Sequence, residues 1–330
     1  MNTFALAVHG GAGTILRSAM TPELEAEYKR GLEDALRKGW AILEKGGSSM
    51  DAVEEAVCGL EDFPLFNAGR GSVFTHEGKN EMDASIMDGK TLRAGAVAFV
   101  RNVKNPIKLA RLVMERTEHV LLGGAGANQF ALEMGVETAD DAYFYTQHRY
   151  EQLLKAREEG VVELDHTASE QEIIEESPNP LVAVDPQSQI RSNKPIGTVG
   201  AVACDSFGNL AAATSTGGMT NKKFGRIGDT PLIGCGTYAD NSACAVSCTG
   251  HGEFFMQGVT AYDVAARMKY QRLSLDAAAG DTIKFLTQIG GEGGLIAVDR
   301  NGNMTMPFNS DGMYRGCIRA DGKIELAIYG

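Results

Sequence analysis

The chain has 330 residues, of which 43% are hydrophobic and 22% are charged, so it can bury a substantial core in one large domain or two average ones. This composition excludes an intrinsically disordered chain and a collagen-like fibre. The 43 acidic and 31 basic residues give a formal net charge of -12, and we expect no nucleic-acid partner because such binding depends on neutralising phosphates.

The N-terminal run from Met1 to Val8 is apolar and predicts a first buried strand that ends at His9. It has no basic region and is too short for a signal peptide or a membrane span, so we expect neither export nor a membrane partner. The six cysteines form no C-x-x-C pair, and we expect buried, reduced thiols in a cytoplasmic protein. They stand at positions 58, 204, 235, 244, 248 and 317.

The first half of the chain predicts mostly helices. Residues 21–45 keep an apolar stripe at helical spacing, with Thr-Pro as the start signal and Gly-Gly as the stop. Trp40 lies in this helix and is expected to be a packing residue. A second helix is predicted from Ser48 or Ser49 to Asp62. Less regular patterns predict helices over residues 107–116, 127–134 and 140–159, and strands over residues 92–100 and 119–122.

The second half predicts mainly antiparallel strands. Small apolar runs predict strands over residues 198–204, 210–216, 243–248 and 294–298. Turns of the form D-x-x-G, at 205–208 and 299–302, indicate hairpins. Hairpin-linked strands together with outlying helices favour a layered α+β fold, with sheets between helices, over a purely parallel sheet.

A segment between the halves, residues 161–195, breaks both periodicities. Four of the nine prolines lie here beside an acidic run at Glu170–Glu176, which is typical of a mobile linker. One interpretation is an ordinary domain boundary. The other is a processing site at the end of the segment.

Several common catalytic motifs are absent from the sequence. It contains no G-x-S-x-G, no P-loop, no H-E-x-x-H and no C-x-x-C. No motif therefore supports a serine esterase, a P-loop phosphate-binding protein or a zinc hydrolase. The run Gly-Gly-Ala-Gly at 123–126 follows a predicted strand, but its spacing does not fit G-x-G-x-x-G. Dinucleotide binding is therefore not favoured.

Three segments rich in glycine and threonine remain, at residues 197–200, 214–218 and 249–253. A threonine hydroxyl needs a base to become a nucleophile, and no histidine or lysine accompanies these segments at a recurring spacing. A free α-amino group, which titrates at about pH 8, can serve as that base on the same residue. Cleavage before Thr198 would create such a group, and Gly197 supplies the permissive backbone for a strained turn.

Seven motifs together carry a resemblance that no single one of them would support. They are H-G-G-A-G (9–13), P-L-F-N-A-G (64–69), M-D-A-S-I-M-D-G (82–89), G-T-V-G-A-V-A (197–203), A-A-A-T-S-T-G-G-M-T-N-K (211–222), G-R-I-G-D-T-P-L-I-G (225–234) and S-C-T-G-H-G-E (247–253). In this order they resemble the plant-type L-asparaginase/isoaspartyl peptidase family of N-terminal-nucleophile (Ntn) hydrolases. The resemblance extends to Pro307-Phe308-Asn309 and spares mainly the linker.

The resemblance implies one αββα sandwich of the Ntn-hydrolase type, made from two chains that stay associated. Intramolecular cleavage of the Gly197–Thr198 bond would give an α chain of residues 1–197, including the linker at about 161–197, and a β chain of residues 198–330. Thr198 would be the nucleophile and, through its free amine, the base. Thr216 would hydrogen-bond the nucleophile and tune its amine.

The resemblance also implies the roles of the residues around the nucleophile. Thr249 and Gly250 would form the oxyanion hole, and Asn67 would brace the nucleophile end of the site. The substrate would be bound by Arg226 at its α-carboxylate and by Asp229 at its α-ammonium group, with Thr249 and Gly252 completing the pocket.

Catalysis needs no cofactor in this family, but a structural sodium ion is implied. It would be held by backbone carbonyls of Leu60, Glu61, Phe63, Phe66, Ala68 and Arg70. Arg70 stands where an apolar or small residue is expected, and it contributes only its carbonyl. His251, between two glycines, is interpreted as a bystander and not as an acid or base.

The leading functional hypothesis is an enzyme that cleaves β-aspartyl (isoaspartyl) dipeptides and L-asparagine through an acyl-enzyme on Thr198, releases L-aspartate, and forms a dimer of αβ units. One alternative within the fold is a glycosylasparaginase, whose nucleophile motif is D-T-I-G where this chain has G-T-V-G. The other is an unprocessed, catalytically idle protein that binds amino acids or acts as a scaffold.

Overall fold

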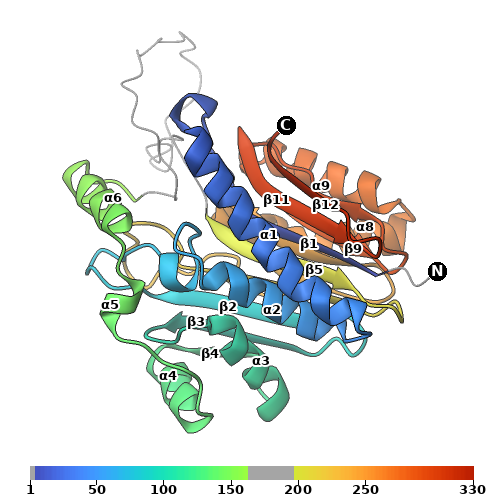
Figure 1. Cartoon of the computed structure of the whole chain (residues 1–330), viewed down its shortest axis with the longest axis horizontal. Coiled ribbons are helices and arrows are strands. Elements are labelled where there is room, and N and C mark those ends of the chain that lie inside the picture. The colour runs from blue at the N-terminus through green and yellow to red at the C-terminus, as the bar shows by residue number, and fades with distance from the viewer. Residues whose placement is uncertain (1–3, 163–196) are drawn as a thin grey trace.

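Two β-sheets lie face to face at the centre of the protein, with helices on both outer sides (Figure 1). The computed structural model describes residues 4–162 and 197–330. The large sheet has the strand order β12-β11-β1-β5-β6-β2-β3-β4, and the small sheet has the order β10-β9-β8-β7. The predicted linker lies almost entirely outside the described residues.

The strands of the large sheet are β1 (Ala5–Gly13), β2 (Met82–Asp88), β3 (Ala94–Val100), β4 (Leu121–Gly123), β5 (Thr198–Cys204), β6 (Leu210–Thr216), β11 (Gly312–Arg319) and β12 (Ile324–Tyr329). Those of the small sheet are β7 (Thr237–Ala239), β8 (Cys244–Gly250), β9 (Gly293–Asp299) and β10 (Met304–Thr305). All pairs are antiparallel except the parallel pair β3–β4.

The α-helices are α1 (Pro22–Glu44), α2 (Ser49–Glu61), α3 (Pro106–Arg116), α4 (Gly124–Glu133), α5 (Asp141–Phe144), α6 (Gln147–Glu158), α7 (Gly252–Gly258), α8 (Thr260–Gln271) and α9 (Leu275–Gln288). Short 3₁₀ turns occur at Arg17–Ala19 and Gly69–Gly71. None of the helices in the two described stretches has the length and apolar character needed to cross a bilayer.

The first two helices begin at side-chain caps that the sequence predicts. The Thr21 hydroxyl accepts a hydrogen bond from the backbone N–H of Leu24, and the Ser48 hydroxyl accepts one from that of Asp51. From these caps α1 and α2 place leucines, valines and alanines on one face each, and those faces are buried against the large sheet. Trp40 packs at the end of α1, with its indole N–H donating to the carbonyl of Arg319.

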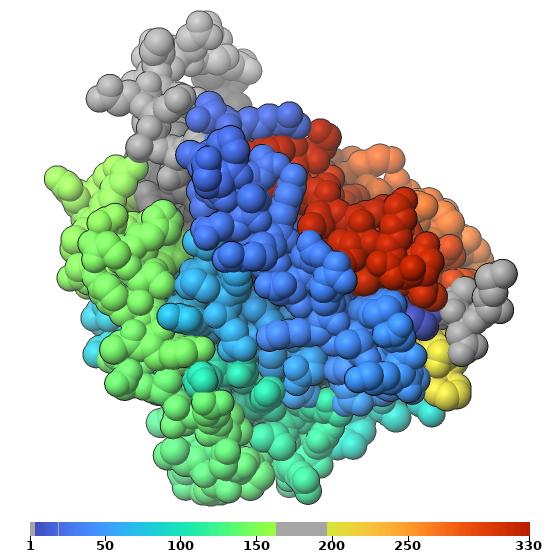
Figure 2. Space-filling model, in the orientation of Figure 1, coloured from blue at the N-terminus to red at the C-terminus, as the bar shows by residue number. Residues whose placement is uncertain are grey.

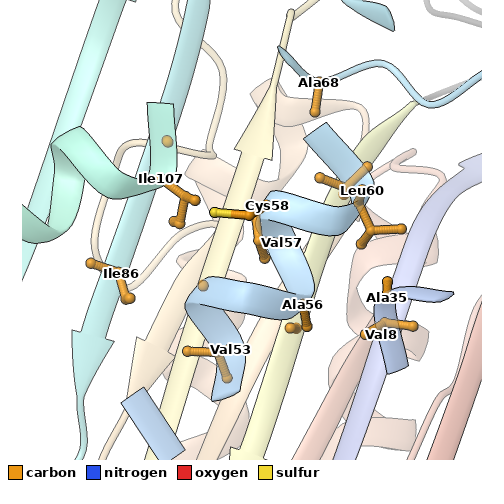
Figure 3. Packing of buried hydrophobic residues seen from close by; sticks show 14 of the residues in the cluster. Val8, Ala35, Val53, Ala56, Val57, Cys58, Leu60, Ala68, Ile86 and Ile107 are labelled. Atoms are coloured by element: carbon orange, nitrogen blue, oxygen red, sulfur yellow. The ribbon is translucent and has the colours of Figure 1, made fainter. Parts of the chain in front are cut away.

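The helices form the outer layers of the sandwich. Helices α1, α2 and α3 cover the large sheet, and α8 and α9 cover the small one. Figure 3 shows Val53 and Val57 of α2 above the strands, with Ile86 of β2 and Ile107 of α3 beside them. In the space-filling view, α1 and α2 (blue) cover the centre of this face and the green helices lie beside them (Figure 2).

The interface between the sheets is built largely from small side chains, with alanines on β1, β6 and β8. This αββα arrangement confirms the predicted fold class. The large sheet also mixes strands from both sides of residue 197, because β1 pairs with β5 and with β11. A cut before Thr198 would therefore leave the two pieces joined through sheet hydrogen bonds.

Three expectations about elements are wrong in detail. The first strand does not end at His9, since β1 continues to Gly13 through a register shift between His9 and Gly11, where Gly11 has φ +115°. The helix expected over 140–159 is two helices, because Tyr145 and Thr146 are extended and the Thr146 hydroxyl caps α6. The helix expected over 127–134 begins earlier, at Gly124.

The hairpin turns and the burial of the thiols agree with expectation. Asp205–Gly208 joins β5 to β6 and Asp299–Gly302 joins β9 to β10, with Gly208 and Gly302 at φ +76° and +77°. Five of the six cysteines are buried, and Cys235 is partly exposed.

Candidate active site

The predicted nucleophile lies at the first position of β5, opposite the last residue of β6. In the register of these strands Thr198 faces Thr216, and the Thr198 hydroxyl donates to the Thr216 hydroxyl at 3.1 Å. The Thr216 hydroxyl also lies 3.4 Å from the carbonyl of Gly197 and accepts from the backbone N–H of Gly218. The two predicted threonines are thus brought into contact beside the bond that cleavage would break.

Asn67 holds the backbone that follows Thr216. Its side-chain amide donates to the carbonyl of Gly218 at 2.8 Å and its side-chain oxygen accepts from the N–H of Val73 at 3.0 Å. A Cβ on Gly217 would lie 2.5 Å from that oxygen, so glycine is required here. Asn67 therefore lies beside the backbone that follows Thr216, and its bracing role stays a prediction.

The predicted oxyanion residues come from the other sheet, at the end of β8. Gly250 lines the same cavity as Thr198, and Thr249 precedes it on the strand. The Thr249 hydroxyl is buried and has no hydrogen-bond partner among the described residues. A buried hydroxyl without a partner is costly, and it becomes satisfied when a ligand oxygen accepts its proton.

Arg226, Asp229 and Gly252 meet on one side of this cavity. A Cβ on Gly252 would lie 2.9 Å from both Arg226 Nη2 and Asp229 Oδ1, so the missing side chain leaves open the space between the two charged groups. An arginine and an aspartate on either side of such a space can bind the carboxylate and the ammonium group of one amino acid.

Burial determines the electrostatics of Asp229. It raises the pKa of this carboxyl to about 7, while the charge of Arg226 acts in the opposite direction. One carboxylate oxygen, Oδ2, is buried and has no hydrogen-bond partner in the described part of the chain. Both features indicate a carboxylate that a cationic ligand group would stabilise.

The cavity itself is small in this uncut chain. It has room for about 10 Å³ of solvent, and Gly197 is among the residues that line it. That is space for about one water molecule. A cavity of this size is too small for L-asparagine or a dipeptide.

Glu253, for which the sequence predicted no role, lies against Arg226. Its two carboxylate oxygens accept hydrogen bonds of 2.9 Å from Nε and Nη2 of Arg226. Burial alone would raise the pKa of Glu253, but the hydrogen bonds from His251 and Arg226 hold it well below its usual range. A substrate carboxylate must share Arg226 with this partner.

His251 contacts Glu253 and not the nucleophile. Its Nε2 lies 3.2 Å from a Glu253 oxygen, and its ring packs edge-on against Phe254. No hydrogen bond to Thr198 or Thr216 is found for His251 within the described stretches. This position agrees with its interpretation as a bystander.

The loop assigned to sodium, residues 60–70, starts at the end of α2 and carries Asn67. A Cβ on Gly69 would lie 2.4 Å from the carbonyl oxygen of Glu61, and one on Gly71 would lie 2.1 Å from that of Phe66. Glycine at these two positions therefore leaves room for the carbonyl oxygens of Glu61 and Phe66. Carbonyl oxygens suit a hard cation, and each keeps a lone pair beyond its turn hydrogen bond, so the residues fit a sodium ion.

Two arginines flank this loop. Arg70 is exposed and its guanidinium lies 5.5 Å from the ring centre of Tyr143, so its side chain contacts α5. Arg149 of α6, which sequence reasoning missed, is buried and donates to the carbonyls of Leu65 and Gly71 at 3.0 and 2.9 Å. Burial lowers the pKa of Arg149 to about 10, so it remains charged at neutral pH.

The chain is similar to known proteins over almost its whole length. The sequence profile of a family described as Asparaginase matches residues 2–328. The chain is 51% identical over 316 residues to an isoaspartyl peptidase of Salmonella typhimurium, covering 96% of this chain and 95% of the relative.

Two further relatives come from other organisms. An isoaspartyl peptidase of Escherichia coli is 48% identical, with 96% of this chain and 92% of the relative covered. A plant-type L-asparaginase of Pyrococcus furiosus is 46% identical, with 94% of each chain covered.

Proposed function

The chain belongs to the asparaginase family, and we propose that it is an Ntn hydrolase that cleaves β-aspartyl (isoaspartyl) dipeptides and L-asparagine and releases L-aspartate. One observation carries the proposal: the Thr198 hydroxyl donates to Thr216 in a cavity that Arg226, Asp229 and Gly250 also line. Nucleophile, oxyanion donors and amino-acid recognition groups are then within reach of one small substrate.

Activation begins with attack of the Thr198 hydroxyl oxygen on the carbonyl carbon of Gly197. The Gly197–Thr198 amide bond breaks, the nitrogen takes up the proton, and an ester to the threonine oxygen remains. Water hydrolyses this ester, leaving a carboxylate on Gly197 and a free amine on Thr198. The amine, titrating at about pH 7.7–8.0, then serves as the base.

Turnover repeats this chemistry on the substrate. The Thr198 amine takes the hydroxyl proton as the oxygen attacks the β-amide carbon, and the developing oxyanion accepts from the Thr249 hydroxyl and the Gly250 N–H. The leaving amine takes the proton from the Thr198 ammonium as the C–N bond breaks. Water then hydrolyses the acyl-enzyme and frees aspartate.

Recognition of the aspartyl group follows from charge. Arg226 binds the α-carboxylate and Asp229 binds the α-ammonium group, with Gly252 leaving the space between them. A substrate lacking either charge would leave one of these buried groups without a partner, which costs affinity.

The remaining expectations form part of the same proposal. A sodium ion held by the carbonyls of residues 60–70 would stiffen the loop that carries Asn67, and the αβ units would pair into a dimer. A reducing cytoplasmic location is supported by the buried thiols, whose desolvation raises the pKa of Cys204 to about 11.

The test is turnover of β-aspartyl-leucine and L-asparagine by wild type and Thr198→Ala, with aspartate release measured. We expect activity only in wild type. The variant lacks the nucleophilic hydroxyl and, because it stays uncut, also lacks the free α-amino group that acts as the base. Wild-type protein that cleaves neither substrate but cleaves a glycosylated asparagine would support the glycosylasparaginase alternative. Uncut protein that binds aspartate without turnover would support the idle alternative.

A further inference from the structure

A buried histidine touches the backbone of the nucleophile from the neighbouring strand. His9 of β1 is fully buried, and its Nδ1 lies 2.9 Å from the carbonyl oxygen of Thr198. Its other nitrogen, Nε2, lies 2.8 Å from the hydroxyl of Ser247 on β8. One imidazole ring therefore links the nucleophile of the large sheet to the small sheet.

His9 lies at the last residue pair of the β1–β5 ladder. Strands β1 and β5 pair from Ala5 opposite Cys204 to His9 opposite Gly200, and beyond this point β1 shifts its register. Thr198 is therefore paired by backbone with β6 alone. The imidazole of His9 contacts the Thr198 carbonyl just beyond the last β1–β5 pair.

The nearby strand leaves space for this ring and its partner. A Cβ on Gly200 would lie 2.0 Å from the Ser247 hydroxyl oxygen and 2.5 Å from His9 Nε2. No side chain fits between them, so the last glycine of the G-T-V-G motif is needed for the His9–Ser247 contact.

The tautomer follows from the partners. Burial lowers the pKa of His9 to about 3, against the effect of its bond to Thr198, so the ring is neutral. A carbonyl can only accept, so Nδ1 carries the proton and Nε2 accepts from the Ser247 hydroxyl. The opposite tautomer would aim a lone pair at the Thr198 carbonyl.

A chain of hydroxyls beyond Ser247 favours this assignment. Ser247 lies 2.7 Å from the Thr214 hydroxyl, Thr237 donates to Thr214, and Ser85, whose proton goes to the carbonyl of Thr230, lies 2.8 Å from the Thr237 hydroxyl. Each hydroxyl has one proton, so donation from Thr237 to Thr214 and from Thr214 to Ser247 leaves the Ser247 proton for Nε2 of His9. The chain therefore supplies the donor that the neutral ring needs.

We propose that His9 is a positioning residue that holds the carbonyl of Thr198 and, after cleavage, keeps the new terminal hydroxyl and amine aimed into the pocket. Ser247 fixes the tautomer in which it can do so. Before cleavage a peptide bond restrains Thr198 on its N-terminal side. After cleavage, Thr198 is restrained only by the peptide bond on its carbonyl side, by its pairing with β6 and by its contact with Thr216. This inference rests on the proposed function.

Removing the His9 contact should lower kcat with little change in KM. A nucleophile displaced by about 1 Å costs on the order of 100-fold in rate, whereas Arg226 and Asp229, which bind the substrate, do not contact His9. We expect His9→Leu to be cut on prolonged incubation but to have kcat lowered roughly 10- to 100-fold. His9→Asn places an amide N–H near the position of Nδ1 and should recover part of this loss.

The experiment measures kcat and KM for β-aspartyl-leucine on fully cleaved His9→Leu, His9→Asn and Ser247→Ala, with thermal unfolding of each. Thr282→Val is the control, because this buried threonine donates to Asp263 outside the network and should lose stability without losing kcat. Ser247→Ala should lower kcat several-fold with KM unchanged. In ¹⁵N spectra of wild type at neutral pH, His9 should carry its proton on Nδ1.

Each possible outcome bears on the inference. It is wrong if His9→Leu keeps the wild-type kcat, or if His9→Asn is as slow as His9→Leu. If His9→Leu does not fold, unchanged kcat in both His9→Asn and Ser247→Ala contradicts it equally. A proton on Nε2 contradicts the tautomer whether or not the enzyme is active, whereas wild type without turnover but with the proton on Nδ1 contradicts the proposed function alone.

Discussion

The two ends of the β5–β6 hairpin differ in whether the buried polar groups near them have hydrogen-bond partners. At the closed end, the Asp205 carboxylate accepts from the N–H groups of Phe207 and Asn209 and from the Asn209 side chain. At the open end, where Thr198 and Thr216 meet, the Thr249 hydroxyl and one Asp229 oxygen are buried without partners in the described residues. Satisfied groups stabilise a turn, and unsatisfied ones are available to a ligand.

A large loss of substrate binding at the open end is expected from Arg226→Ala. Losing one partner of a buried, hydrogen-bonded charge pair costs about 2–5 kcal/mol, so KM for L-asparagine should rise roughly 30-fold or more. Cleavage before Thr198 should continue, because no hydrogen bond joins Arg226 to Gly197 or Thr216 in the described stretches. Steady-state kinetics check this, and unchanged KM would remove Arg226 from the carboxylate site.

Thr249→Val keeps the shape of the side chain and removes the unpaired hydroxyl. Loss of one oxyanion donor lowers kcat by about 100- to 1,000-fold, while the free energy of unfolding should rise or stay constant because a buried unsatisfied group disappears. The two measurements are single-turnover rates and urea denaturation. Loss of stability with normal kcat would place this hydroxyl in a structural role instead.

The pH dependence separates binding from chemistry at the open end. Asp229, with its pKa raised to about 7, loses the charge that binds the substrate ammonium as pH falls through 7. The Thr198 amine is protonated below about pH 7.7–8.0. On the acid side, kcat should therefore fall with one proton and kcat/KM with two.

This dependence is tested by rate profiles between pH 5 and 9 with β-aspartyl-leucine. In Asp229→Asn, KM should be high at every pH and its dependence on pH should disappear. A one-proton fall of kcat/KM in wild type would show that Asp229 is ionised throughout or does not bind the ammonium group.

At the closed end, Asp205→Ala should affect stability alone. Hydrogen bonds to a charged acceptor contribute about 1.5–3 kcal/mol, so the free energy of unfolding should fall by about that amount. Asp205→Asn, which keeps one acceptor oxygen, should lose less. A marked change in kcat, measured under conditions where the variant is fully folded, would show that the closed end also affects catalysis.

The difference between the two ends also explains what the sequence could predict. The Asp205–Gly208 turn and helices α1 and α2 follow from local chemistry, since a capping hydroxyl, a stripe of leucines or an aspartate before a glycine acts on its own neighbours. Helix α9 carried a similar signal that was missed, with Ser274 as its cap and Ala278, Ala279 and Leu286 on one face.

The open end depends on contacts between residues far apart in the chain. Thr198, Arg226 and Asp229 would each look like ordinary strand or turn residues, and only the ordered resemblance predicted that they meet. Glu253 and the partners of His9 were missed because nothing local in the sequence shows which side chains face one another across two sheets. The partners of His9 follow from strand register, and Glu253 is placed by helix α7; only the fold supplies both.

The central claim is that Thr198 becomes the first residue of a separate chain, and intact mass of purified wild type tests it most directly. The β chain would hold 133 of the 330 residues, so the 35.2 kDa precursor should give fragments of about 21 and 14 kDa, the smaller one beginning at Thr198. Thr198→Ala should stay at full length, and Thr198→Ser should be cut slowly because it keeps the hydroxyl without the methyl group that restricts its rotamer. A single full-length species in wild type that nevertheless hydrolyses β-aspartyl-leucine would contradict the account.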